Sequence, residues 1–221
     1  MANVRKAGMI PIGAGINFDQ FSLPVFLDVK GTRLGVLAFN DTGTNYLGQD
    51  NPGAMPALDS WVEQSIKEAR DSVDILIVQI HWGYEDKELP SERQIELGHN
   101  MVKWGADIVV GHHPHQWQPI EFYQNSVIAY SIGNFTFDQN DVENNLSGVL
   151  VFKYNGKIRQ DIYVLPVELI SLDGFPAPAT GELLTKFEDY IRMVNANFNS
   201  RIYTDSMGFH FEENTEDTIQ R

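Results

Sequence analysis

The amino-acid sequence predicts an α/β fold in a single domain, and three observations support this. In the first half of the chain, short apolar runs typical of buried strands alternate with segments of helical spacing. In the second half, strand patterns follow one another before a further helical pattern. A length of 221 residues with 43% hydrophobic residues is sufficient for one sizeable core, so disorder is excluded for most of the chain.

The first predicted elements are a β-hairpin and a helix. Residues 25–29 and 34–39 lie on either side of the turn-like pair Lys30-Gly31, which predicts two strands of one hairpin. Residues 40–55 are rich in Asn, Asp, Gly and Pro, and we interpret them as a long surface loop. A helix is predicted over residues 56–72, where the residues at helical spacing are Leu58, Trp61, Val62, Ile66 and Ala69.

A strand–helix–strand unit follows. Residues 74–80 form an apolar strand pattern, and Ser91 with Gln94 resembles a capping box that opens a helix running to Trp104. Residues 106–110 form the second apolar strand. A crossover of this length joins parallel strands, and α/β proteins bind their ligands at the carboxyl ends of such strands.

The second half of the chain is predicted to be mainly β-structure. Residues 127–131, 148–154 and 158–165 have strand patterns, and Asn155-Gly156 between the last two predicts a tight hairpin turn. Residues 182–198 place apolar side chains on one helical face, and the polar end of the chain is expected to fray.

The composition excludes several classes of function. The chain has 30 acidic and 16 basic residues, a formal net charge of −14, which argues against nucleic acid as a partner. It has no cysteine, so a thiolate metal site and disulfides are impossible. No apolar run is long enough to form a transmembrane segment, and residues 1–15 are not a targeting segment. These first residues resemble the end of a helix, so we expect the chain to begin partway into a larger fold.

Four of the six histidines stand at the ends of the two strands of the strand–helix–strand unit, namely His81, His112, His113 and His115. Neutral imidazole is a common metal ligand and suits Zn, Mn or Fe. In an extended loop, His113 and His115 point the same way, and Pro114 stiffens the backbone between them. His81 then completes a three-nitrogen face. The alternative is that these are surface or hydrogen-bonded loop histidines.

The sequence around these histidines resembles the bacterial capsule-synthesis family typified by the poly-γ-glutamate synthesis protein CapA. The resemblance is carried by IHWG at 80–83, GADIVVGHHPH at 105–115, QPIE at 118–121 and YSIGNFTFD at 130–138. It implies a calcineurin-like metallophosphoesterase fold, a β-sandwich flanked by helices with a two-metal site at the strand ends. It also implies His81 and His113 as catalytic residues and His81, His113 and His115 as metal ligands, with His112 as an alternative ligand.

The chain departs from the family pattern because the early aspartate and Asn-His motifs are absent. We therefore expect the N-terminal part of the domain to be missing and the bridging carboxylate with it. Residues 1–170 then form a partial domain, and 171–221 form a C-terminal helix and polar tail. A divalent cofactor metal (Mn, Zn or Fe) is expected to be weakly bound or absent in such a fragment.

Several other residues are candidates for supporting roles at this site. We expect Asn134, Asp138 and Glu121 to hold the ligand histidines through hydrogen bonds. The alternatives are a tight turn at Asn134, with Phe135 and Phe137 in the core, and a solvated carboxylate at Glu121.

The remaining polar and aromatic side chains are open to two interpretations each. The acidic loop of Glu85, Asp86 and Glu88 is either solvated or a source of a general base. The tryptophans Trp82, Trp104 and Trp117 form either a ligand-stacking wall or core. His99 and His210 are expected to be structural or solvent-facing.

The resemblance implies metal-dependent hydrolase chemistry, of phosphoesterase type, in the production of capsule, poly-γ-glutamate or another envelope polymer. It implies an extracytoplasmic or cell-envelope location and an anionic polymer or phosphoester as substrate. The alternative is a catalytically silent binding or scaffold domain. An incomplete fold exposes sheet surface, so we also expect self-association into a homo-oligomer.

Overall fold

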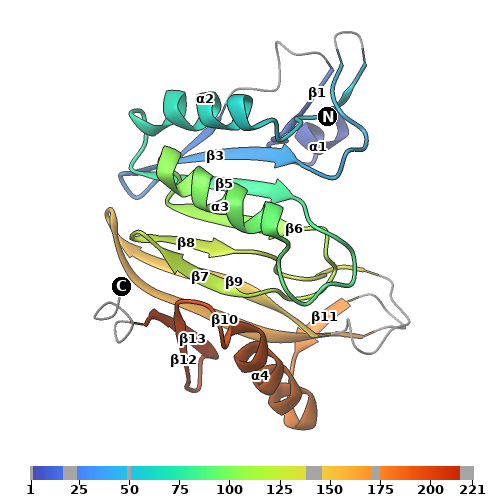
Figure 1. Cartoon of the computed structure of the whole chain (residues 1–221), viewed down its shortest axis with the longest axis vertical. Helices are drawn as coiled ribbons and strands as arrows, with labels where there is room; N and C mark the ends of the chain where they lie inside the picture. Colours follow the sequence, from blue (N-terminus) through green and yellow to red (C-terminus); the bar gives the residue numbers. More distant parts are fainter. Residues whose placement is uncertain (1, 17–23, 49–50, 138–145, 171–174, 215–221) are drawn as a thin grey trace.

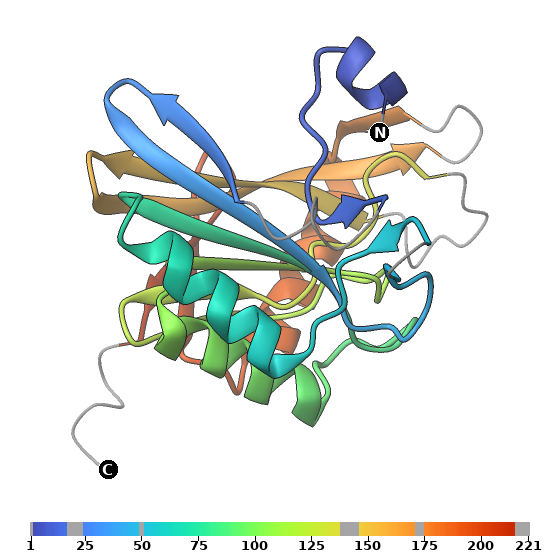
Figure 2. The ribbon, with the colours of Figure 1, turned by 90° about the horizontal axis from the view of Figure 1, so that it is seen from above.

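The computed structural model describes residues 2–16, 24–48, 51–137, 146–170 and 175–214. Two helices cover one face of a six-stranded sheet, and a second sheet packs on the other face (Figures 1 and 2). A further helix packs on the second sheet and also contacts one edge of the first (Figure 1). The predicted α/β class is therefore confirmed as a mixed α/β architecture with several sheets.

The six-stranded sheet has the order β2-β3-β5-β6-β8-β7. Its central strands β3, β5, β6 and β8 are parallel, and both edge strands are antiparallel to their neighbours. The strands are β2 (Val25–Val29), β3 (Thr32–Asn40), β5 (Ile75–His81), β6 (Ile108–His112), β7 (Ile120–Tyr123) and β8 (Ser126–Ala129). The predicted hairpin and the predicted parallel pair are both present, so the carboxyl ends of β3, β5 and β6 meet at one edge.

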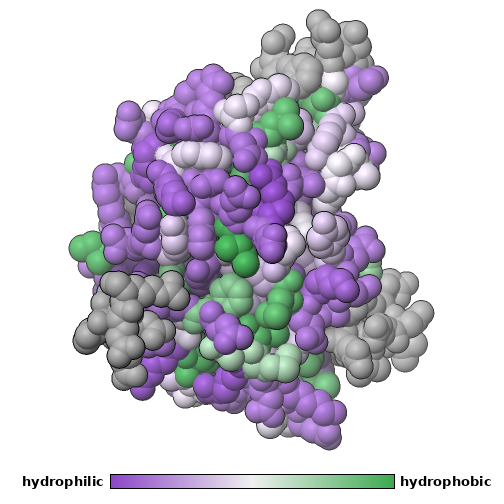
Figure 3. Space-filling model, in the orientation of Figure 1, coloured by the Kyte–Doolittle hydropathy of each residue, from purple (hydrophilic) through white to green (hydrophobic). Residues whose placement is uncertain are grey.

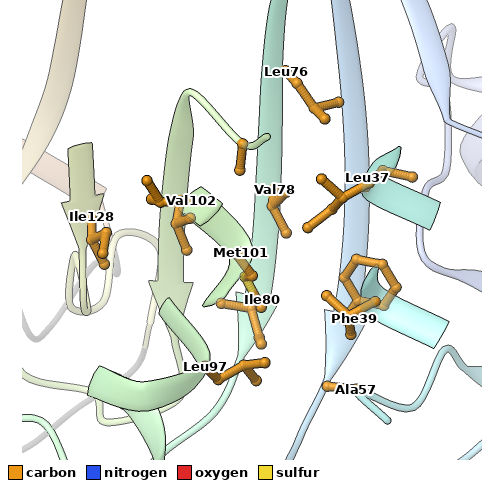
Figure 4. Close-up of a cluster of buried hydrophobic side chains, with 14 of the residues drawn as sticks. Leu37, Phe39, Ala57, Leu76, Val78, Ile80, Leu97, Met101, Val102 and Ile128 are labelled. Atoms are coloured by element: carbon orange, nitrogen blue, oxygen red, sulfur yellow. The ribbon is translucent and has the colours of Figure 1, made fainter. Parts of the chain in front are cut away.

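Helices α2 (Asp59–Arg70) and α3 (Glu92–Trp104) pack on this sheet. The predicted capping box is confirmed, because the side chain of Ser91 accepts a hydrogen bond from the backbone N–H of Gln94 and the side chain of Gln94 accepts one from the backbone N–H of Ser91. Figure 4 shows the apolar core between the helices and the strands. Its labelled residues are Leu37, Phe39, Ala57, Leu76, Val78, Ile80, Leu97, Met101, Val102 and Ile128.

The second sheet is built around the hairpin of β9 (Leu146–Asn155) and β10 (Ile158–Ile170). This hairpin was predicted from its Asn-Gly turn. Strands β11 (Phe175–Pro178) and β13 (Phe209–Glu213) pair with β10, and β12 (Ser200–Thr204) pairs with β13.

Helix α4 (Gly181–Asn195) packs on the second sheet through its predicted apolar face. The expectation of only a helix and a polar tail after residue 170 was wrong in one respect, because β11, β12 and β13 join the second sheet. His210, assigned to the tail, is only 2% exposed in β13.

The short elements are α1 (Ala2–Lys6), β1 (Ala14–Gly15) and β4 (Gly53–Ala54), and β1 pairs with β4. The predicted loop after β3 therefore contains a strand. Trp82 and Trp117 are almost fully buried and Trp104 packs against the core, so the stacking-wall interpretation was wrong.

The visible surface is mostly hydrophilic over α2 and α3, while apolar side chains gather between α3 and α4 (Figure 3). Among the described helices, none is long and apolar enough to cross a membrane.

Candidate metal centre

The histidines lie where the sequence predicted them, at the carboxyl ends of two neighbouring parallel strands. His81 ends β5 and pairs in register with His112, which ends β6. His113, Pro114 and His115 form a bend directly after β6. The sheet thus brings all four imidazoles to the edge at which α/β folds bind ligands.

The bend has a backbone that few side chains adopt. His113 has a φ of 102° and His115 a φ of 62°, so the expectation of an extended loop was wrong. Such conformations cost on the order of 1–3 kcal/mol each and persist only where surrounding contacts hold them. One such contact joins two loops, because the backbone N–H of Asp86 donates to the carbonyl of Pro114 at 2.9 Å.

The same contact between loops brings a carboxylate to the histidines. Each of Glu85, His113 and His115 offers one ligand atom, and these three atoms lie within 4.8 Å of one another. The two histidines are partly buried and Glu85 is exposed. The sequence analysis considered Glu85 as a general base and did not identify it as a candidate ligand. These three residues are called the metal group below.

His81 lies beside the metal group rather than in it. Its ring centroid is 4.6 Å from that of His113. Burial lowers the pKa of His81, and the neighbouring imidazoles of His113, His112 and His115 lower it further, against a smaller opposite effect of Glu85. A lowered pKa favours the neutral imidazole, which is the form that binds metal or accepts a proton.

Asn134 fixes the orientation of His115. Its Oδ1 lies 2.7 Å from Nδ1 of His115, so that Nδ1–H donates and Nε2 is left to bind a metal. The ring of Phe137 packs at 5.2 Å from the same imidazole. Phe135 and Phe137 are 46% and 44% exposed, so the interpretation that they fill the core was wrong. Asp138 lies outside the described residues.

Two predicted residues lie away from the metal group. His112 Nε2 hydrogen-bonds Oε1 of Gln79 at 2.8 Å, and burial lowers the pKa of His112. Glu121 contacts no histidine of this site. Its carboxylate accepts hydrogen bonds from Nε2 of His99 at 3.0 Å and from the hydroxyl of Tyr130 at 2.6 Å. His99 is thus structural, as expected.

The metal group suits a divalent ion of the Zn, Mn or Fe type. Two imidazoles and one carboxylate form a nitrogen–oxygen donor set, and three protein ligands leave positions open for water or substrate. In the described parts of the chain, no second group of three such residues lies as close together. Asp41, which follows β3, is held by Arg93 at 3.2 Å.

Comparison with known proteins gives a consistent family assignment. Residues 1–139 match the family model described as "Bacterial capsule synthesis protein PGA_cap". The chain is 34% identical over 204 residues to "PGA biosynthesis protein CapA" of Bacillus subtilis, covering 90% of this chain and 52% of that protein.

Two further relatives extend this finding. "Capsule biosynthesis protein CapA" of Bacillus anthracis is 33% identical over 187 residues, covering 81% of this chain and 44% of the relative. A "Probable polyglutamine synthesis accessory protein" of Mycobacterium tuberculosis is 28% identical over 152 residues, covering 62% of this chain and 40% of the relative. The chain spans about half the length of the curated relatives it matches. The family model covers more than half of the chain and includes every residue of the metal group, and the chain therefore belongs to the bacterial capsule synthesis protein PGA_cap family.

Proposed function

We propose that this chain carries the histidine part of a divalent-metal centre in a phosphoesterase-like hydrolase of capsule or poly-γ-glutamate production. The observation that carries the proposal is the convergence of Glu85, His113 and His115 within 4.8 Å at the carboxyl ends of parallel strands. The left-handed backbone of both histidines adds weight, because strained conformations concentrate at functional sites.

Each residue has a definite role in this proposal. Glu85, His113 and His115 hold the ion, and Asn134 orients His115. A bound divalent ion supplies Lewis acidity and a water of lowered pKa. His81, neutral and beside His113, binds the ion from a further side or accepts a proton at the reacting centre.

The wider context follows from the family. Two relatives are named for capsule or PGA biosynthesis, which supports a place in the cell envelope and an anionic polymer or a phosphoester as substrate. The mixed α/β architecture, with two packed sheets and outer helices, is consistent with a calcineurin-like metallophosphoesterase sandwich.

Metal binding tests the proposal directly. We expect the tag-free protein, dialysed against Mn²⁺ or Zn²⁺, to bind the ion in calorimetry and to retain it in elemental analysis. His113→Ala and Glu85→Gln should each weaken binding at least tenfold. Glu88→Gln is the matched control, because Glu88 is an exposed acid of the same loop outside the metal group. Equal binding by Glu85→Gln and Glu88→Gln would contradict the proposal.

The second candidate function is a catalytically silent binding or scaffold domain. It is favoured by the finding that, among the described residues, the metal group has three ligands and no second group accompanies it. Hydrolysis of bis(p-nitrophenyl) phosphate separates the two functions. Turnover that requires Mn²⁺ and is lost in His113→Ala supports the hydrolase, whereas metal binding without any turnover supports the silent domain.

A further inference from the structure

An apolar cavity of about 580 Å³ lies between the two sheets, next to the metal group. Strands β5 and β6 form one wall, β9 forms the opposite wall, and residues 132–137 cross one end. Nine apolar residues line it, namely Ile77, Ile108, Val110, Ile132, Phe135, Phe137, Val149, Leu150 and Phe152. Sites for small molecules have this size and this mainly apolar lining.

The cavity offers a ligand few polar partners. Among the described residues that line it there is no Asp, Glu, Lys or Arg. Gln79 and His112 lie on the same wall and hydrogen-bond each other at 2.8 Å. A charged group buried there has no partner of opposite charge, and its burial is therefore costly. The part of a ligand inside the cavity is therefore uncharged and apolar.

The shape of the cavity favours a linear group. It runs along β6 from Ile108 to His112, which corresponds to about 13 Å at the rise of a β-strand. Its two walls are apolar faces of the two sheets. A cavity of this length between two apolar walls can hold an extended alkyl chain.

One end of the cavity opens at the metal group. Asn134 and Phe137 both line the cavity, and both contact the imidazole of His115. The half-exposed rings of Phe135 and Phe137 form its rim. A divalent ion on the metal group makes this end cationic, which matches an anionic head group attached to an apolar chain.

We propose that this cavity binds the alkyl chain of a single-chain alkyl phosphate and that the phosphate lies at the metal group. The position of the phosphate rests on the proposed metal centre, whereas binding of the chain rests on the cavity alone. The inference therefore names an amphiphilic phosphoester as the substrate class of the site.

Calorimetry with butyl, octyl and decyl phosphate, below their micelle concentrations, tests the inference. With EDTA present, we expect affinity to rise about fourfold for each methylene, the equivalent of about 0.8 kcal/mol per buried methylene. Leu150→Trp places a larger side chain in the cavity and should abolish binding of decyl phosphate. Leu27→Trp is the matched control, since Leu27 is also a leucine in a strand and does not line the cavity.

The two proposals fail separately. Affinity that is independent of chain length, or equal binding by Leu150→Trp and Leu27→Trp, overturns the cavity inference even where Mn²⁺ still binds. If the affinity in EDTA depends on chain length but does not rise when Mn²⁺ is added, the cavity inference stands and the proposed position of the phosphate is overturned. Light scattering is measured in parallel. A dimer that Leu150→Trp dissociates, together with no alkyl phosphate binding, overturns the inference, because a second copy then covers the cavity.

Discussion

At the scale of single residues, the imidazole of His115 is held on two sides. Asn134 accepts a hydrogen bond from its Nδ1, and Phe137 packs against the ring. Asn134 is itself buried, with 7% of its surface exposed, so it has little freedom to turn away. Groups that orient a ligand histidine in this way contribute to metal affinity although they do not touch the metal.

Replacing Asn134 should therefore weaken metal binding without removing a ligand. We expect Asn134→Ala to raise the dissociation constant for Mn²⁺ or Zn²⁺ by about 10–100-fold, because the His115 ring loses its fixed tautomer and orientation. Titration calorimetry measures this change. Asn51→Ala, at an exposed position outside the metal group, should bind as the unchanged protein does. Unaltered affinity in Asn134→Ala would show that Asn134 serves only the turn at Gly133.

The histidines were predictable from the sequence, and the carboxylate of the metal group was not. His81 and His112 follow apolar runs of recognisable strand type, so their meeting at one edge follows from a parallel sheet. The position of Glu85 depends on a hydrogen bond between the loop after β5 and the loop after β6. The left-handed φ of His113 was equally hidden, because a residue before proline ordinarily adopts an extended conformation.

At the scale of elements, an ion cluster around the buried His210 attaches β12 and β13 to β10. Nδ1 of His210 lies 3.0 Å from a carboxylate oxygen of Asp161, and Nε2 lies 3.0 Å from Asp205. Tyr163 and Tyr203 stack on the ring, with centroids at 5.1 and 4.7 Å. Burial alone lowers the pKa of His210, but the hydrogen bonds and charges of Asp161 and Asp205 outweigh it and raise the pKa.

This cluster predicts a pH dependence of stability with a definite sign. Because the folded pKa of His210 is raised, its contribution is fully present below the unfolded value of about 6.5 and is lost as pH rises through the folded pKa. We expect the free energy of unfolding of the protein, relative to that of His210→Gln, to fall as pH rises above the unfolded value of about 6.5. Urea unfolding at a series of pH values measures it.

The comparison with the variant is necessary because other histidines act in the opposite direction. His81 and His112 have lowered pKa values, so their contributions to stability grow as pH rises toward the unfolded value of about 6.5 and are complete above it. The difference between protein and variant cancels these contributions. Parallel pH profiles for the two proteins would rule out an ion cluster at His210.

The strands β12 and β13 show why part of the fold escaped prediction. Strand β10 and the hairpin turn after β9 carry a clear local pattern, and both were predicted. The two late strands are short and mix polar with apolar residues, and their stability comes from partners distant in the sequence, such as Tyr163 opposite His210. Strand formation depends on such cross-strand contacts more than on intrinsic preference.

At the scale of the whole molecule, the net charge of −14 affects how metal binding is measured. An acidic surface attracts any divalent cation loosely, and salt screens this attraction over about 8 Å at 0.15 M. Binding at the metal group differs, because its ligands come from two loops that only the folded sheet brings together. Such binding stabilises the folded state and does not stabilise the unfolded chain.

Metal binding should therefore raise the melting temperature in a way that salt does not remove. At a free Mn²⁺ or Zn²⁺ concentration of about 100 times the dissociation constant, the expected gain is about 2.7 kcal/mol. For a chain of this length that corresponds to roughly 5–10 °C. Scanning calorimetry in 0.15 M NaCl should show this shift for the protein and for Glu88→Gln, and lose it in Glu85→Gln. A shift of equal size in all three proteins means that the ions bind the acidic surface and that the metal group is not their site.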